Sequence, residues 1–219
     1  MGKNKKLNSF GRIITLVLIL VIPGLLHYYL RQTGQNVYLE LPYPGSPEAG
    51  SVTRVAPFSL TNEKGETVSF PERQSVKVVH FMHSDCDAFG GLMNEAMDAL
   101  AKKFGKHPFV DLYSISLDPA DDERILAALA EKYQTQQTNW QFLWGAADST
   151  SKIAREHFLV DGYQDKSSKE IIHTPYFILL DSNQQIRGYY EFHTKDEMER
   201  LIGEVILLVT EEYRRPENI

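Results

Sequence analysis

The sequence contains a single cysteine, Cys86, among 219 residues. A chain with one thiol cannot form an intramolecular disulfide, and it cannot run a redox cycle that needs two cysteines of its own. Positive charge is also scarce, because the formal net charge is −6 and no basic cluster with interleaved aromatic residues occurs in the body of the chain. This charge balance argues against a nucleic-acid-binding protein. Ordinary apolar and charged fractions instead predict one globular domain with an appendage.

The appendage is at the N-terminus, where a short basic stretch precedes a long apolar run. Residues 1–12 contain four lysine or arginine residues and no acidic one, and residues 13–30 are mostly apolar. This run is near the lower limit of length for a helix that crosses a bilayer. No small-residue cleavage site follows it, so we expect an uncleaved membrane anchor rather than a signal peptide. The preceding positive charges predict a cytoplasmic N-terminus, with the domain in the periplasm or on the outer face of the membrane.

Residues 31–50 are rich in proline and glycine and show little periodicity, which predicts a tether between the anchor and the domain. The tether would let the domain, residues 51–219, meet another membrane protein. A plain spacer without such a role is the alternative.

Within the domain, short β-branched or aromatic runs alternate with segments of helical periodicity. One helix is predicted to start at Asp118 as its cap, because Pro119 suits the first helical position and acidic residues follow. A capping pattern at Thr194 predicts the start of the last helix. The expected strands are residues 58–61, 66–70, 78–82, 109–116, 140–144, 176–181 and 186–192, and the expected helices are residues 93–104, 118–133, 149–158 and 194–209. This alternation predicts an α/β fold with a central sheet and helices on both faces.

The stretch around Cys86 has the strongest functional pattern. An apolar strand ends shortly before the cysteine, and a helix with one apolar face follows it. A thiol between a strand and a helix lies near the helix N-terminus, where the unpaired N–H groups and the macrodipole favour a thiolate. The alternative is a cysteine that serves only as a small buried hydrophobic residue.

The order of the elements is similar to that of a thioredoxin-like fold, and a series of motifs resembles the Sco/SenC family of copper-handling proteins. The segments that carry the resemblance are the hairpin at 58–70, the strand end and loop from Phe81 to Cys86, Ser114 to Pro119, Trp140 to Leu143, and Ile172 to Asp181. Together they cover nearly the whole chain, and an N-terminal anchor is also typical of the family. The resemblance implies copper bound by two loop cysteines and a distal histidine, in a membrane protein that assists the assembly of a respiratory cytochrome oxidase.

The metal loop departs from the family pattern. Cys86 matches the first family cysteine, but Gly90 stands at the position of the second. The resemblance therefore leaves two metal ligands, Cys86 and His173. A thiolate and an imidazole suit Cu(I), whereas Cu(II) prefers more nitrogen and oxygen donors. Further candidate ligands near the cysteine are His83, Asp85 and Asp87.

Two histidines near the end of the strand could approach the site from different sides. Strand alternation puts His80 and Met82 on one face and His83 on the other. Which face looks toward the site stays open. For both histidines, a structural role in or beside the sheet is the alternative to metal binding.

Pro175 follows Thr174 directly before an apolar strand. The resemblance to thioredoxin-like folds predicts a cis bond between these two residues, since a proline in that form commonly precedes the strand that faces the active-site loop. The cis form of such a bond costs only about 0.5–1 kcal/mol. It would bring His173 close to Cys86. The alternative is an ordinary trans proline that opens an edge strand.

Three functions remain open. The first is a membrane-anchored copper-binding protein, with a respiratory oxidase subunit or another copper chaperone as its partner. The second is a degenerate thioredoxin-like scaffold or binding module without metal, which the missing second cysteine favours. The third is a thiol redox protein in which Cys86 is catalytic and forms a mixed disulfide or a sulfenic acid. Only the third is an enzyme, a thiol-disulfide oxidoreductase.

Overall fold

The computed structural model describes residues 53–84, 88–165 and 170–213, and five positions nearer the N-terminus (19, 21–23 and 25). The chain divides into two compact units, Met1–Glu40 and Leu41–Ile219, and the fold below is that of the second. Within the described part of the chain, no helix combines the length and the hydrophobicity that crossing a membrane requires. Most of the predicted anchor at 13–30 lies outside the described residues, as do the basic end at 1–12 and the tether at 31–50.

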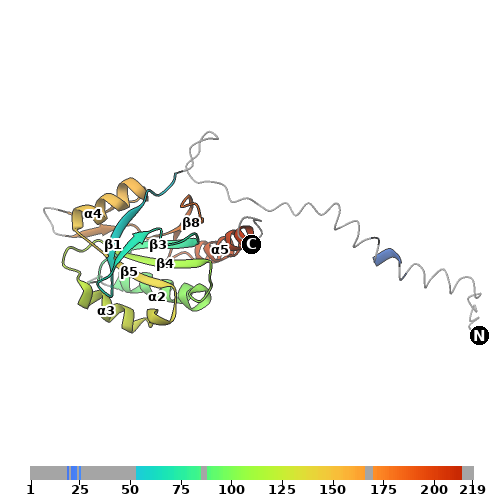
Figure 1. The fold of residues 1–219 in the computed structure, drawn as a ribbon, viewed down its shortest axis with the longest axis horizontal. Helices are drawn as coiled ribbons and strands as arrows, with labels where there is room; N and C mark the ends of the chain where they lie inside the picture. Colours follow the sequence, from blue (N-terminus) through green and yellow to red (C-terminus); the bar gives the residue numbers. More distant parts are fainter. Residues whose placement is uncertain are drawn as a thin grey trace, which may run out of the picture. The chain divides into compact units, whose positions relative to one another are not determined.

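A seven-stranded sheet forms the centre of the domain (Figure 1). Its strand order is β2-β1-β5-β4-β3-β8-β9, in which β3, β4 and β5 are parallel and the other neighbours are antiparallel. The strands are β1 (Phe58–Asn62), β2 (Thr67–Phe70), β3 (Val76–Met82), β4 (Val110–Ser116), β5 (Trp140–Trp144), β8 (Tyr176–Leu180) and β9 (Ile186–Glu191). Two short strands, β6 (Gly162–Gln164) and β7 (Ile171–His173), pair with each other in a separate ribbon. The predicted α/β arrangement is confirmed.

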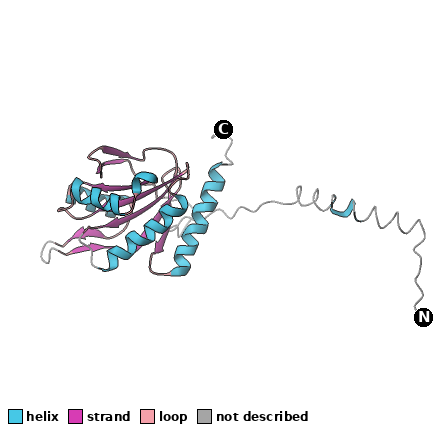
Figure 2. Ribbon diagram, turned by 90° about the horizontal axis from the view of Figure 1, so that it is seen from below, coloured by secondary structure: helices cyan, strands magenta, loops and turns pink. Residues whose placement is uncertain are grey.

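Helical segments cover both faces of the sheet, and Figure 2 shows them around the strands. The helices α2 (Ala88–Phe104), α3 (Glu123–Lys132) and α5 (Lys195–Tyr213) contribute apolar side chains to the core on one face. The other core receives the π-helical turn η2 (Ile153–His157), which continues α4 (Ala147–Lys152). A short 3₁₀ turn, η1 (Thr135–Gln137), precedes β5. The sheet thus separates two apolar cores.

Strand β3 lies inside the sheet and is buried along its whole length. Its side chains alternate between the two cores, with Val78 and Met82 in one and Val79 and Phe81 in the other. A continuous apolar run is typical of a strand covered on both faces. The register of the strand is given by its pairing with β4 and β8, which places Met82 at the end of the strand, just before His83 and Ser84.

The predicted start of the second helix is wrong. Helix α3 begins at Glu123, with Asp122 as its N-cap, and the Asp122 side chain accepts a hydrogen bond from the Ile125 N–H at 3.0 Å. Asp118 closes a separate turn, because its Oδ1 accepts from the Ala120 N–H at 2.8 Å. The three residues between the predicted and observed caps, 119–121, form a turn that precedes the helix.

The prediction of a cis bond before Pro175 is also wrong. Among the described residues, the cis peptide bond joins Phe70 and Pro71, and Thr174–Pro175 is trans. The trans form is the more stable by about 0.5–1 kcal/mol in the absence of a local constraint. Here the Pro175 carbonyl accepts a hydrogen bond from the Phe192 N–H at 3.1 Å, which continues the pairing of β8 with β9 by one step.

Candidate functional site

The described residues include the flanks of the predicted metal loop. Asp85, Cys86 and Asp87 lie outside the described residues, and so does the side chain of His173. His83 and Ser84 follow β3 and are both partly exposed. Helix α2 resumes the chain at Ala88. The assignment of these residues as metal ligands therefore stays a prediction. The structure describes the residues around them.

The sheet topology brings the flanks of two predicted ligands to one edge. Strands β3 and β4 are parallel, so their carboxyl ends lie at the same edge of the sheet. Strand β8 is antiparallel to β3 and therefore begins at that edge. His173 ends β7, three residues before Tyr176 opens β8. The backbone of His173 thus arrives at the edge from which His83 and Ser84 leave β3, and this is the edge where α/β sheets commonly bind ligands.

The buried carboxylate of Asp121 links the start of the metal loop to the segment that connects β4 to α3. Asp121 is only 3% exposed. It accepts a hydrogen bond from the Ser84 N–H at 3.1 Å, a second from the Ser84 hydroxyl, and a third from the Ser116 hydroxyl at 2.5 Å. The Leu117 N–H also donates to the Met82 carbonyl at 2.8 Å, which extends the pairing of β3 with β4. The chain is therefore fixed on this side up to Ser84.

Sequence reasoning missed Asp121, because it counted the acidic residues after Pro119 as helix-capping charges. The available signal was the adjacent pair Asp121-Asp122, since one N-cap needs only one of them. Nothing in the sequence identifies Ser84, which is 37 residues away, as the partner.

His80 has a structural position in the sheet. It is completely buried on the same face as Met82, and its Nε2 lies 2.5 Å from the Ser114 hydroxyl oxygen. The Trp140 indole N–H donates to the same oxygen at 2.9 Å, and the Phe177 ring lies 5.3 Å from the His80 imidazole. His80 therefore packs in the core between strands, and the question of which strand face looks toward the metal site stays open.

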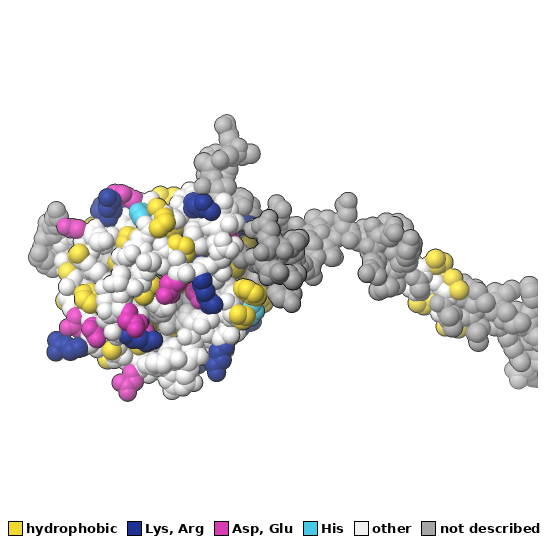
Figure 3. All heavy atoms as spheres, in the orientation of Figure 1, with side chains coloured by type: hydrophobic (Ala, Val, Ile, Leu, Met, Phe, Trp, Pro, Cys, Tyr) yellow, Lys and Arg dark blue, Asp and Glu magenta, His cyan; other side chains and the backbone are white. Residues whose placement is uncertain are grey.

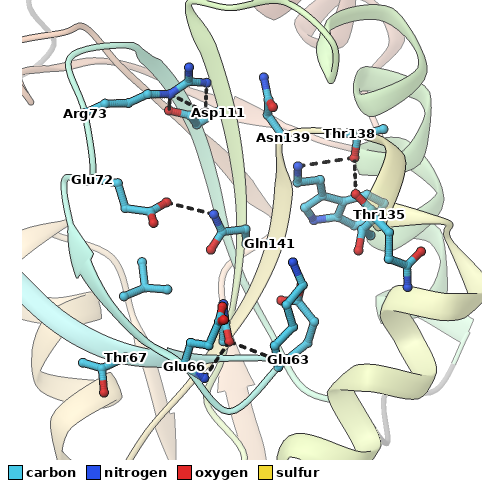
Figure 4. Close-up of a pocket in the computed structure, with 15 residues that line it drawn as sticks. Glu63, Glu66, Thr67, Glu72, Arg73, Asp111, Thr135, Thr138, Asn139 and Gln141 are labelled. Atoms are coloured by element: carbon cyan, nitrogen blue, oxygen red, sulfur yellow. Dashed lines mark hydrogen bonds and ion pairs between the residues drawn. The ribbon is translucent and has the colours of Figure 1, made fainter.

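A polar pocket lies at the opposite edge of the sheet (Figure 4). It has a volume of about 500 Å³, and its wall includes Asp111 and Gln141, which are near the amino ends of β4 and β5. Its carboxylates have partners within the domain: Glu72 accepts from the Gln141 amide at 2.8 Å, and Asp111 pairs with Arg73. Burial, followed by the nearby charges of Asp111 and Glu72, raises the pKa of Tyr113 beside this pocket. These contacts give the pocket a structural role in joining the β1–β2 hairpin to the sheet.

Figure 3 shows acidic and basic side chains interspersed on one face, without a basic patch. Within the ranges that the structure describes, no three His, Cys, Asp or Glu side chains gather in a way that could hold a metal ion. A groove lined by Ser84 and by Ile125, Ala128, Leu129 and Lys132 of α3 lies beside the start of the loop.

Comparisons with known proteins agree with this fold. The SCO1/SenC family model matches residues 47–207. The structure of a SCO1/SenC family lipoprotein from Bacillus anthracis has a TM-score of 0.63 and 23% identity, over 71% of this chain and 95% of that one. BsSco, described as a member of the Sco family of cytochrome c oxidase assembly proteins, has a TM-score of 0.60 and 22% identity, over 73% and 95%. Bradyrhizobium japonicum ScoI with copper bound has a TM-score of 0.55 and 17% identity, over 71% and 99%. The sequence matches no curated protein.

Proposed function

The chain belongs to the SCO1/SenC family, and we propose that it binds copper and assists the assembly of a respiratory cytochrome oxidase. The observation that carries this proposal is the antiparallel pairing of β8 with β3, which starts β8, just after His173, at the edge where β3 leads to Cys86. A thiolate and an imidazole are a donor set that suits Cu(I). The copper-bound structure of Bradyrhizobium japonicum ScoI supports the same function, as does BsSco, a member of the Sco family of cytochrome c oxidase assembly proteins.

Copper is the cargo in this proposal, and Cys86 and His173 are its two ligands. A copper ion with only two protein ligands has open coordination positions. A ligand from a partner protein can bind there, which permits transfer of the ion. His83 is the described candidate for a third ligand, since it is partly exposed directly after β3. Cu(II) would need such additional nitrogen or oxygen donors.

The proposal includes a membrane anchor. Residues 13–30 would hold the chain in the membrane, with residues 1–12 in the cytoplasm and the domain on the outer face. Protease added to intact spheroplasts should then digest the domain but spare a tag on the N-terminus. Digestion of neither end would contradict this orientation.

The first experiment is a Cu(I) titration of the full-length protein in detergent, in competition with a chelator of known affinity. Wild type should bind one equivalent, and Cys86→Ser and His173→Ala should each lose it. His107→Ala is the matched histidine control, because His107 lies between α2 and β4, at the other end of the sheet. Binding that survives both ligand substitutions would contradict the proposal, and effects of Cys86→Ser alone would favour a thiol redox protein.

One observation favours a second function, that of a scaffold or binding module without metal. Gly90 stands where the family has its second loop cysteine. The substitution Gly90→Cys separates the two functions. If the loop binds copper, a second thiolate should tighten Cu(I) binding and should make it less dependent on His173. If the chain is a scaffold, wild type should show no binding above the Cys86→Ser, His173→Ala double variant.

A further inference from the structure

Asp121 has more hydrogen bonds than the fold around it requires. Helix α3 is already capped by Asp122, and the turn before it is closed by Asp118. Asp121 nevertheless lies almost fully buried and accepts from the Ser84 N–H, the Ser84 hydroxyl and the Ser116 hydroxyl. Burying a carboxylate is costly unless its oxygens are well paired. These bonds therefore stabilise one particular position of Ser84.

Ser84 is two residues before Cys86 and is the last described residue on that side of the loop. Both its backbone N–H and its side chain bond to the same carboxylate, so its position and its orientation are fixed together. Ser116 supports the carboxylate from β4, and its hydroxyl oxygen also accepts from the Asp118 N–H at 3.1 Å. The network thus connects the exit of β3 to the rigid end of β4.

We propose that Asp121 is a positioning residue for the metal loop, which acts through Ser84 to hold Cys86 in its metal-binding position. The proposal rests on the proposed copper function for its main readout. Groups hydrogen-bonded directly to a metal ligand typically change metal affinity by about 10- to 100-fold when they are removed. Asp121 bonds to Ser84, two residues before the ligand, so Asp121→Ala should weaken Cu(I) binding by about 10-fold, the lower end of that range.

The matched control is the neighbouring residue. Asp122→Ala removes the cap of α3 and lowers thermal stability, but it should leave Cu(I) affinity unchanged, because the Asp122 side chain bonds to the Ile125 N–H and to Arg124 rather than to the loop. Equal losses of affinity in the two variants would overturn the proposal, since both would then reflect destabilisation alone. Unchanged affinity in Asp121→Ala would overturn it as well.

Two serine variants keep the test valid if Asp121→Ala does not fold. Ser84→Ala removes the hydroxyl that bonds to Asp121, and Ser84→Thr retains it. We expect weaker Cu(I) binding in Ser84→Ala and recovery of wild-type affinity in Ser84→Thr. Identical affinities of the two variants would contradict the positioning role.

A second readout needs no copper and separates this proposal from the proposed function. The rate at which iodoacetamide alkylates Cys86 in the folded, metal-free protein reports the accessibility and reactivity of the thiol. Asp121→Ala should raise this rate and Asp122→Ala should not. If wild type fails to bind copper, the proposed function is wrong, and the alkylation rates alone then decide whether Asp121 positions the loop. Equal rates in wild type and Asp121→Ala would overturn it.

Discussion

Removal of the Ser114 hydroxyl gives the clearest test of how much the buried hydrogen bonds stabilise the sheet. The hydroxyl oxygen of Ser114 lies 2.5 Å from His80 Nε2 and accepts from the Trp140 indole N–H at 2.9 Å. All three residues are buried on the same side of the sheet. Ser114→Ala deletes one oxygen atom and takes a hydrogen-bond partner from two buried polar groups at once.

The expected cost follows from those two groups. A buried polar atom that loses its partner costs about 1–3 kcal/mol, so Ser114→Ala, which affects two such atoms, should lower the free energy of unfolding by about 2–6 kcal/mol. Domains of this kind are stable by about 5–15 kcal/mol, so the loss is a large fraction of the total stability. With a urea m-value of about 2 kcal/mol/M, the unfolding midpoint should fall by about 1–3 M.

The assay is equilibrium urea unfolding of wild type, Ser114→Ala and the control Ser59→Ala. Ser59 is exposed on β1, where a substitution should change stability by less than about 0.5 kcal/mol. A midpoint for Ser114→Ala equal to that of Ser59→Ala would refute the reasoning. Cu(I) affinity should stay unchanged in Ser114→Ala, because His80 is structural in this account; a loss of copper from the folded variant would also contradict it.

Two further predictions concern stability. The backbone hydrogen bond from Ile125 is the main reason why the pKa of Asp122 lies below its ordinary value, so the stabilisation by this cap is present at neutral pH and is lost as pH falls through the folded-state pKa. Thermal unfolding should therefore show Asp122→Ala less stable than wild type at pH 7, with the difference shrinking below about pH 4, and a constant difference would contradict it. Gly188→Ala should cost about 1–3 kcal/mol, because its new Cβ would meet the buried Tyr190 ring, which bonds to Glu204; an unchanged urea midpoint would show that the ring can move.

The central strands were predictable because their signals are local. Residues 140–144 carry an aromatic side chain at every second position, and they form β5 with the predicted bounds. The apolar run that ends at Met82 similarly forms β3, which is buried on both faces. Both segments are short runs rich in β-branched or aromatic residues, which is the local pattern of a strand in the interior of a sheet.

The failures occur where tertiary contacts choose between equivalent local signals. Asp118 and Asp122 can each cap a helix, and the choice of Asp122 goes together with the burial of Asp121 against Ser84, which no local pattern announces. Strands β6 and β7 were missed because each has only three residues, too few to show alternation. The start of β8 was predicted, but the bond before Pro175 was not, because the cis expectation came from the fold resemblance rather than from the chain.

The sequence predicts which residue types form the candidate site, but it does not predict the strand pairing that brings them together. A lone thiol between a strand and a helix, and a histidine before a strand, can both be found in the sequence. That β8 pairs with β3 and starts at the edge where β3 ends is a property of the sheet order. Sequence periodicity identifies strands but does not say which strands are neighbours.

Copper K-edge X-ray absorption on the full-length protein loaded with one equivalent of Cu(I) tests most directly whether Cys86 and His173 hold the ion. We predict one sulfur and at least one nitrogen neighbour per copper, and we expect His173→Ala to retain no copper under the same loading conditions. A coordination shell without sulfur, or a wild-type protein that retains no copper, would contradict the account. Two sulfur neighbours per copper would contradict it too, because Cys86 is the one cysteine of the chain and the second sulfur would have to come from a methionine or from another chain.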